Sequence, residues 1–321
     1  MNNPLVSIII PTYNRAHFIG ETLESVIAQS CPNWECIVID DGSSDYTDEL
    51  MEFYCEKDSR IQYHHRPSNK PKGANACRNY GFDLSKGEYV NWFDSDDVYD
   101  LDCLKNILSL IKFKEKIDII IVPYQFIDNL GKKGTLITLE LPFNDLYKDY
   151  ALWNLKIITG SLWIKKSFLI DEEYLFDTNI LRGQETEFFL RLFFDKKINF
   201  HLVEAVSFYY RKHNNSKSFE DQVFNENFQM SVAKIYCDNY EKVFSYNDIK
   251  LLKYYHKRTV SFWFRGLDYK SKLVRNYISQ RLFSIYKRRI FFRLKFKLIF
   301  EIHEVYGKRI FKLVNYLKNQ Y

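Results

Sequence analysis

The chain has 321 residues, of which 46% are hydrophobic and 17% aromatic, and its formal net charge is +5. This is the composition of a globular protein, and the length suits one large α/β domain or a domain with an appendage. No run of about 18 uncharged apolar residues occurs, so no membrane span is predicted. The start, Met1 to Pro4, lacks the basic and apolar stretches of a signal peptide.

The spacing of the cysteines indicates the cellular compartment, and the uneven distribution of charge indicates the kinds of partner. Six cysteines are scattered without a Cys-x-x-Cys pair, which favours reduced thiols in a cytoplasmic protein over disulfides or a zinc site. Residues 248–321 contain 19 Lys and Arg against 4 Asp and Glu, whereas residues 1–247 contain 27 against 37. The two parts of the chain are therefore expected to face different partners.

Short apolar runs alternate with stretches of helical spacing as far as about residue 123. The predicted strands are Val6–Ile10, Trp34–Ile39, Ile61–His64, Tyr89–Trp92 and Ile117–Pro123. The predicted helices between them are Asn14–Gln29, Thr47–Tyr54, Gly73–Leu84 and Leu101–Lys114. This order predicts an α/β fold with a mostly parallel sheet flanked by helices, whose ligands bind beyond the carboxyl ends of the strands.

The rest of the chain is patterned differently. Residues 124–218 are less regular, and from Phe219 onward the chain has few Gly or Pro and is predicted to be mainly helical. We therefore predict two domains, 1–218 and 219–321, the second a basic, aromatic-rich, mainly helical extension.

Polar residues follow three of the predicted strands directly. Pro11-Thr12-Tyr13, Asp40-Asp41-Gly42 and Asp94-Ser95-Asp96-Asp97 would all meet at one sheet edge. Carboxylates at the end of a buried strand are costly unless they stay solvated or find a cation. Oxygen ligands suit Mg²⁺ or Mn²⁺, which are commonly carried with substrate phosphates. Taken alone, the run Asp94–Asp97 has a solvated acidic turn as its alternative, and Asp40-Asp41-Gly42 has a plain strand-to-helix turn.

Six segments together resemble the family-2 glycosyltransferases, which have the GT-A nucleotide-sugar fold. They are VSIIIPTYNR (6–15), IVIDDGSSD (37–45), GANACRNYG (73–81), GEYVNWFDSDD (87–97), GQETEFFLRL (183–192) and YYRKHNNSKS (209–218). The resemblance covers roughly residues 5–218 and excludes the basic C-terminal part. It implies inverting transfer of a sugar from a nucleotide donor to an acceptor hydroxyl.

The resemblance also implies roles for individual residues. Asp41 would accept a hydrogen bond from uracil and Tyr13 would stack on that base, with Pro11, Thr12 and Arg15 in the same loop. Arg78 would pair with the diphosphate, and Ser95 lies within the Asp-x-Asp motif. The divalent ion, Mn²⁺ or Mg²⁺, would be bound by Asp96 first, then Asp94, with Asp97 as a further ligand or a cap of the next helix. A surface position is the alternative for Arg78.

Three further segments are assigned by the same resemblance. Glu185 matches the catalytic carboxylate, although the usual Glu-Asp pair is Gln184-Glu185 here. Its rival is Glu187, whose alternative role is that of a first-turn acid of a helix predicted over 187–194. Arg211 and His213 would lie over the donor phosphates, with surface solvation as the alternative. The turn Thr159-Gly160-Ser161 would shape the acceptor side.

The basic C-terminal segment has more than one interpretation. If residues 287–302 are helical, an apolar row lies beside a basic row, as in helices that bind anionic membranes. A helical lid on the core is the alternative, and no motif supports nucleic-acid binding. The protein is therefore expected to be cytoplasmic, as the scattered cysteines indicate. If the basic segment binds membrane, the protein would lie peripherally on the inner face of the cell membrane.

These expectations define one function and two alternatives. The chain is predicted to be a metal-dependent, inverting glycosyltransferase that uses a UDP-sugar and a glycan or lipid-linked acceptor in bacterial surface-polysaccharide assembly. A nucleotidyltransferase of related fold would need a Gly-rich basic loop after the first strand, which residues 11–15 do not provide. The other alternative is a non-catalytic protein that binds a sugar nucleotide or a membrane surface.

Overall fold

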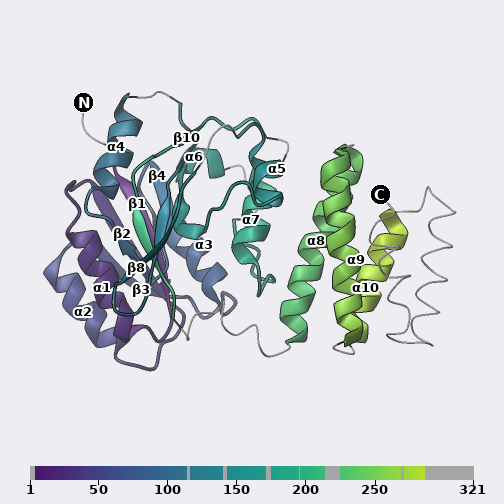
Figure 1. The fold of residues 1–321 in the computed structure, drawn as a ribbon. Coiled ribbons are helices and arrows are strands. Elements are labelled where there is room, and N and C mark those ends of the chain that lie inside the picture. Colours follow the sequence, from purple (N-terminus) through teal and green to yellow (C-terminus); the bar gives the residue numbers. More distant parts are fainter. Residues whose placement is uncertain are drawn as a thin grey trace. The chain divides into compact units, whose positions relative to one another are not determined.

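The computed structural model describes residues 4–113, 116–139, 143–170, 175–194, 196–213, 225–246, 248–268 and 271–285 (Figure 1). The segment 287–302, predicted to contact membrane, lies outside the described residues. The chain divides into two units by its internal contacts. The first comprises Met1–Thr178 and Arg191–Asp221, and the second comprises Asn179–Leu190 and Gln222–Tyr321.

The first unit is built on a seven-stranded sheet. Its strands are β1 (Val6–Thr12), β2 (Trp34–Asp40), β3 (Ile61–His65), β4 (Tyr89–Trp92), β6 (Ile119–Ile121), β9 (Leu162–Lys165) and β10 (Phe200–Leu202). They lie in the order β10-β6-β9-β4-β1-β2-β3. Strand β9 runs antiparallel to both neighbours, and the other pairs are parallel. The predicted α/β fold with a mostly parallel sheet is confirmed.

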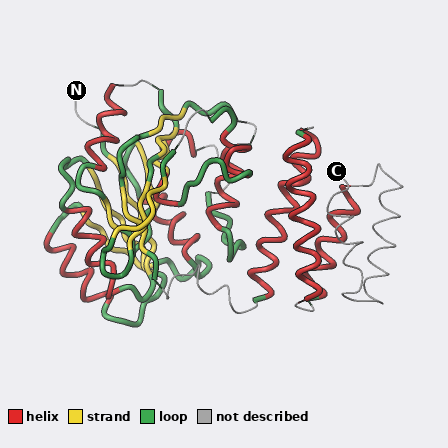
Figure 2. Tube along the Cα trace, viewed as in Figure 1, coloured by secondary structure: helices red, strands yellow, loops and turns green. Residues whose placement is uncertain are grey.

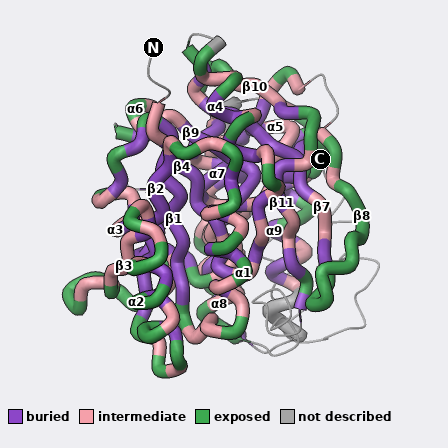
Figure 3. The backbone as a smooth tube through the Cα atoms, turned by 90° about the vertical axis from the view of Figure 1, so that its left-hand side faces the viewer, coloured by how far each residue is buried: buried purple, intermediate pink, exposed green. Residues whose placement is uncertain are grey.

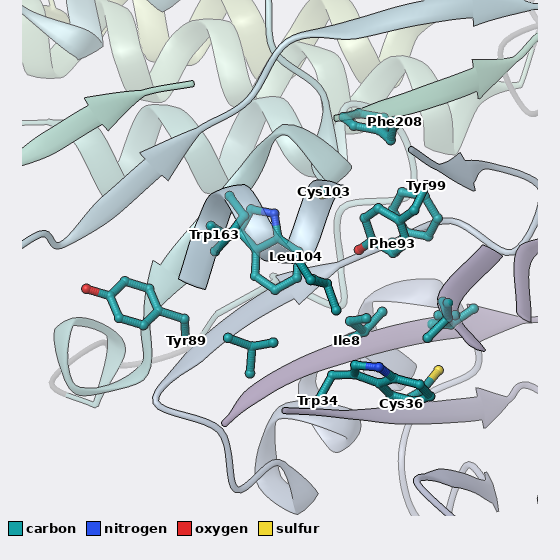
Figure 4. Close-up of a cluster of buried hydrophobic side chains, with 14 of the residues drawn as sticks. Ile8, Trp34, Cys36, Tyr89, Phe93, Tyr99, Cys103, Leu104, Trp163 and Phe208 are labelled. Atoms are coloured by element: carbon teal, nitrogen blue, oxygen red, sulfur yellow. The ribbon is translucent and has the colours of Figure 1, made fainter. Parts of the chain in front are cut away.

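Helices cover both faces of this sheet. They are α1 (Ala16–Ile27), α2 (Thr47–Lys57), α3 (Ala74–Leu84) and α4 (Cys103–Phe113). Strands β1 and β2 are buried along their whole length, as expected for parallel strands covered on both sides (Figure 3). One large core joins side chains of β1, β2 and β4 to α1, α2 and α4, and Figure 4 labels Ile8, Trp34 and Trp163 within it.

Helix α3 packs on the opposite face of the sheet and approaches it closely. Cys77 of α3 lies in a smaller cluster with Ile37 and Ile39 of β2. A Cβ atom built at Gly81 would lie 2.3 Å from Ile9 Cγ2 of β1, a distance that real Cβ atoms do not show. Glycine at this position therefore sets how near α3 comes to the strands whose ends carry the predicted donor loops.

A second sheet of four strands extends the first unit. Its order is β5-β11-β7-β8, from β5 (Val98–Tyr99), β11 (Phe208–Arg211), β7 (Tyr124–Ile127) and β8 (Lys133–Ile137). Strand β11 pairs antiparallel with β5, with Phe208 opposite Tyr99. Because β5 begins directly after the acidic run, this pairing brings residues beyond β11 to the run. The sequence patterns did not predict this sheet.

The remaining elements of the first unit are short. They are α5 (Leu146–Ala151), the 3₁₀ turn η1 (Thr159–Ser161) and α6 (Lys166–Leu169). All three residues of η1 are buried, and the Gly160 carbonyl accepts a hydrogen bond from Asn91 Nδ2 at 3.0 Å.

The second unit is helical in its described part (Figure 2). Its helices are α8 (Glu226–Tyr246), α9 (Ile249–Asp268) and α10 (Lys272–Ile285), together with the first part of α7 (Gln184–Phe193), which continues into the first unit. Tyr240 of α8 and His256 of α9 share a buried hydrogen bond of 3.1 Å. None of the described helices is both long enough and apolar enough to cross a bilayer.

Candidate active site at the carboxyl edge of the sheet

Three loops meet at the carboxyl edge of the first sheet. The parallel register pairs Thr12 with Asp40, and the amide of Asp41 donates to the carbonyl of Thr12 at 2.9 Å. On the other side of β1, the amide of Phe93 donates to the carbonyl of Ile9 at 2.9 Å. The strands therefore end together, and the loops after β1, β2 and β4 leave from one edge, as the sequence predicted.

The two adjacent carboxylates after β2 have different environments. Asp40 is fully buried, and its Oδ1 accepts hydrogen bonds from the amides of Gly42 and Ser43, both at 2.6 Å. Its Oδ2 accepts from Ser43 Oγ at 2.5 Å. Asp40 thus forms the turn itself, whereas Asp41, which is 7% exposed, takes no part in these turn hydrogen bonds.

Asp41 is held by a residue that the sequence interpretation missed. Arg66, which follows β3, donates from Nε to Asp41 Oδ1 at 2.6 Å, and the amide of Gly73 donates to the same oxygen at 3.1 Å. The rule applied to the other loops, that polar residues directly after a parallel strand meet at the ligand edge, would have found Arg66.

The loop after β1 is fastened to the loop after β2. Asn14 adopts a positive φ of 52°, its amide donates to Ser43 Oγ, and its Oδ1 accepts from the amide of Ser44, both at 2.8 Å. Tyr13 is 44% exposed, and Lys72 Nζ lies 4.5 Å from its ring centroid. Pro11 and Thr12 are buried within β1, so Tyr13 is the exposed side chain of the predicted Pro-Thr-Tyr loop.

The acidic run presents Asp94 and Asp96 in different ways. Asp94 is 36% exposed at its side chain, and its Oδ1 accepts from Arg78 at 2.9 Å. Asp96 Oδ2 lies 2.8 Å from His213 Nε2 and 3.9 Å from Arg15 Nε. Burial and the charge of Asp94 raise the pKa of the Asp96 carboxyl, against the opposing effects of His213 and Arg15. Ser95 between them is buried.

Asp97 turns into the protein. It is 1% exposed, and its Oδ1 accepts from the amide of Arg211 at 2.9 Å. Burial, and then the charges of Asp96 and Asp94, raise the pKa of Asp97 well above its ordinary value. The predicted helix cap is wrong, because Asp97 is followed by strand β5 and the next helix, α4, begins at Cys103.

Arg211 links several parts of the first unit. Its Nε donates to the Asp96 carbonyl at 2.9 Å, its Nη1 to the Asp128 carbonyl at 3.3 Å, and its Nη2 pairs with Glu21 at 2.6 Å. His213 packs against the ring of Phe18, with centroids 4.7 Å apart. The structure therefore brings Arg211 and His213 to the acidic run, where both contact Asp96.

Asp94 and Asp96 are the carboxylates at this edge with the chemistry to hold a divalent ion. Within the described ranges, no group of three or more His, Cys, Asp or Glu side chains is arranged as a complete metal site. A cation would, however, offset the burial and repulsion that raise the pKa of Asp96. Mg²⁺ usually binds one or two carboxylates and completes its shell with substrate phosphates and water. Asp94 and Asp96 therefore fit an ion that is carried with a diphosphate.

The predicted base, Glu185, lies on helix α7. Helix α7 begins at Gln184, directly after Gly183 with its positive φ of 72°, so it starts three residues earlier than predicted. Glu185 and Glu187 are both in its first turn, and the amide of Glu187 donates to the carbonyl of Gly183 at 2.9 Å. The choice between them as base stays a prediction.

Comparisons with known proteins agree with this fold. The model of the family described as glycosyl transferase family 2 matches residues 7–172. The chain is 30% identical over 187 residues to Escherichia coli WfgD, a UDP-Glc:alpha-D-GlcNAc-diphosphoundecaprenol beta-1,3-glucosyltransferase, covering 57% of this chain and 72% of WfgD. It is 39% identical over 108 residues to TuaG of Bacillus subtilis, a putative teichuronic acid biosynthesis glycosyltransferase, covering 34% of this chain and 42% of TuaG.

A solved structure shares the fold across most of the chain. S. aureus TarS (residues 1–349), crystallised with UDP-GlcNAc, superposes with a TM-score of 0.65 at 18% identity, covering 88% of this chain and 81% of TarS. The matched segments span only 18%, 21% and 55% of three Rickettsia relatives described as uncharacterised glycosyltransferases. The family match covers more than half of this chain and includes the loops after β1, β2 and β4. The chain belongs to glycosyl transferase family 2.

Proposed function

We propose that the chain transfers a sugar from a UDP-sugar to an acceptor hydroxyl, with inversion, in the synthesis of a bacterial surface polysaccharide or lipid-linked glycan. The observation that carries this proposal is the meeting of Asp41, Asp94 and Asp96 at one sheet edge in a family 2 chain. Arg66 and Arg78 supply positive charge beside them.

The donor would bind through its base and its diphosphate. Asp41 would accept a hydrogen bond from the uracil N3–H, and the exposed ring of Tyr13 would stack on the base. Arg78, next to Asp94, would pair with the diphosphate. A related fold that was crystallised with UDP-GlcNAc supports a uridine nucleotide as the donor class.

Asp94 and Asp96 would hold Mn²⁺ or Mg²⁺. Such an ion, when bound, neutralises the negative charge that develops on a departing diphosphate. The proposal does not extend to Asp97, because its buried carboxylate accepts from the Arg211 amide and holds β11 against the acidic run. Arg211 and His213 would act by holding Asp96 beside the donor phosphates.

An inverting transfer needs a base to take the proton of the acceptor hydroxyl. We assign this role to Glu185, with Glu187 as the rival in the same helical turn. The buried turn at Thr159–Ser161 would shape the acceptor side. WfgD acts, by its name, on a diphosphoundecaprenol-linked acceptor, which supports a lipid-linked acceptor for this chain.

The reaction can be tested by a screen of nucleotide sugars with Mn²⁺ or Mg²⁺, measuring nucleotide release. The expected result is UDP release from one UDP-sugar, lost in Asp96→Ala and kept in Asp83→Ala, a matched control on the exposed side of α3. Pyrophosphate release from a nucleoside triphosphate would instead identify a nucleotidyltransferase. Tight UDP-sugar binding without any turnover would identify a non-catalytic binding protein.

The membrane hypothesis for residues 287–302 has a separate test. Flotation of the full chain with liposomes that contain anionic lipid should exceed flotation with neutral liposomes, because basic segments are drawn to anionic surfaces. Equal recovery from both, or none from either, would contradict it. The proposal for the donor site does not depend on this outcome.

A further inference from the structure

We propose that Arg66 is the residue that sets nucleobase selectivity, by fixing which oxygen of Asp41 faces the base and where. This inference rests on the proposed function, since it concerns the same donor site. Arg66 would not touch the donor itself. It is a positioning residue that acts through Asp41.

Arg66 and Asp41 form a largely buried pair of opposite charge. The side chains of Arg66 and Asp41 are 14% and 9% exposed, and Nε lies 2.6 Å from Oδ1. An ion pair that is largely removed from water is held far more rigidly than a surface pair, since breaking it leaves an uncompensated charge. The Gly73 amide, 3.1 Å from the same oxygen, fixes it from a second direction.

The guanidinium is itself fixed by its own loop. Nη1 of Arg66 donates to the carbonyls of Pro67 and Lys70, and the Arg66 amide donates to the carbonyl of Asp40 at 2.8 Å. Residues 66–70 therefore wrap around the guanidinium and anchor it to the end of β2. A lysine could keep a positive charge there, but its compact ammonium lacks the planar fork that serves Asp41 and the two carbonyls together.

The second oxygen of Asp41 is the one left for a ligand. In the described part of the chain, hydrogen bonds to the Asp41 carboxylate reach Oδ1 only, and Oδ2 is not sealed from solvent. Uracil offers a donor at N3, whereas cytosine offers an acceptor at N3 and a donor at its 4-amino group. A carboxylate oxygen held opposite N3 accepts a hydrogen bond from uracil, but it is repelled by the lone pair on N3 of cytosine. A carboxylate that is free to rotate can instead accept from the 4-amino group of cytosine, so it discriminates less between the two bases.

The same loop also contacts the side chain of Tyr13. Lys72, beside Gly73, places its ammonium 4.5 Å from the ring centroid of Tyr13, the residue proposed to stack on the base. Residues 66–73 therefore contact both proposed base-binding side chains. Two of these contacts, from Arg66 Nε and from the Gly73 amide, act on Asp41, the group proposed to read the hydrogen-bonding edge of the base, and of the two only the Arg66 contact is made by a side chain.

Arg60 provides a matched control for Arg66. The two arginines flank β3 at opposite ends, and each pairs with an aspartate at 2.6 Å, Asp58 for Arg60 and Asp41 for Arg66. Only Arg66 lies at the carboxyl edge. Arg66→Lys, Arg66→Gln and Arg60→Lys can therefore be compared in the full chain, with thermal denaturation to show that each is folded.

The experiment measures dissociation constants for UDP and CDP by calorimetry, and the readout is the ratio Kd(CDP)/Kd(UDP). We expect wild type and Arg60→Lys to prefer UDP equally, and Arg66→Lys to lower the ratio about tenfold, the loss typical of a hydrogen bond to a charged group. In a chain that already carries Asp41→Asn, adding Arg66→Lys should not lower the ratio Kd(CDP)/Kd(UDP) further, because Arg66 acts through Asp41. A purely structural role would weaken UDP and CDP alike and leave the ratio unchanged.

The outcomes separate this inference from the proposed function. If wild type binds UDP selectively and both folded Arg66 variants keep that selectivity, the role of Arg66 is overturned and the donor class stands. If wild type binds neither nucleotide, the proposed function fails, and the role of Arg66 fails with it. A ratio that falls equally in Arg60→Lys would also overturn the inference.

Discussion

His213 and Asp96 lie 117 positions apart in the sequence, yet His213 Nε2 and Asp96 Oδ2 are 2.8 Å apart. The antiparallel pairing of β11 with β5 creates this contact, because it places the residues after β11 beside those before β5. Carboxylates that hold metals are commonly oriented by a hydrogen bond from a neighbouring group. His213 is suited to that role for the proposed ion.

Replacing His213 should therefore weaken the response to metal. We expect His213→Ala to raise the Mn²⁺ concentration needed for half-maximal UDP release by about 10- to 100-fold, the usual effect of removing such a partner. His17→Ala is the control, since His17 is exposed and also packs on Phe18, without an ion pair to Asp96. An unchanged metal requirement in His213→Ala would contradict this role.

Replacing the proposed base should stop chemistry without removing the donor. Glu185→Gln keeps the size of the side chain but cannot accept a proton, so we expect turnover to fall by about 10²- to 10⁴-fold. UDP binding, measured by calorimetry, should stay within about twofold of wild type. The companion variant Glu187→Gln should retain most activity, and the reverse pattern would transfer the role to Glu187.

Enlarging Gly81 should destabilise the first unit. The added methyl of Gly81→Ala would meet Ile9 Cγ2 at 2.3 Å, and overpacking of this kind costs about 1–3 kcal/mol of unfolding free energy. Gly20→Ala in α1 is the control, because its nearest contact would be Tyr54 Oη at 3.3 Å. Urea denaturation measures both. In an Ile9→Ala background the cost of Gly81→Ala should shrink, since the clashing methyl is absent.

His64 should make stability depend on pH. Burial lowers the pKa of His64, and its Nε2 lies buried without a hydrogen-bond partner among the described residues. The unfolded chain therefore takes up this proton more readily, so unfolding free energy is lost as pH falls below the ordinary histidine pKa of about 6.5. His64→Phe should reduce that loss between pH 7.5 and 5.5.

The same variant should be more stable at neutral pH. Removing an unsatisfied buried nitrogen is expected to add about 1 kcal/mol at pH 7. The neighbouring His65 has a side chain that is 62% exposed, so His65→Phe should not reduce the acid loss. Denaturant titrations at several pH values measure both effects, and parallel curves for wild type and His64→Phe would contradict the prediction.

The first half of the fold could be predicted because its signals are local. Strands buried on both faces read as short apolar runs such as Val6–Ile10, and polar residues mark their ends. The second sheet could not be predicted in this way. Strand β5 has two residues, and its partner β11 is more than 100 positions away, so no local periodicity records the pairing.

The sequence predicts which residues gather at the site better than it predicts what each of them does there. Adjacent Asp40 and Asp41 look alike in the sequence, and only the hydrogen bonds of Asp40 show that it builds the turn. Asp97 looks like its neighbours Asp94 and Asp96 in the sequence, and only its burial and the hydrogen bond from the Arg211 amide to its Oδ1 set it apart. These roles depend on partners that the fold brings from distant positions, which spacing along the chain does not encode.

The pairing of β5 with β11 also bears on how the protein acquires its site as it folds. Strands β1 and β2 pair across 28 positions, whereas Arg211 must close a loop of 114 residues to reach Asp97. Closing longer loops costs more chain entropy, and contacts of high sequence separation form slowly. During refolding, secondary structure followed by circular dichroism should therefore recover before UDP binding. Donor binding would then report the last long-range step of folding in the first unit.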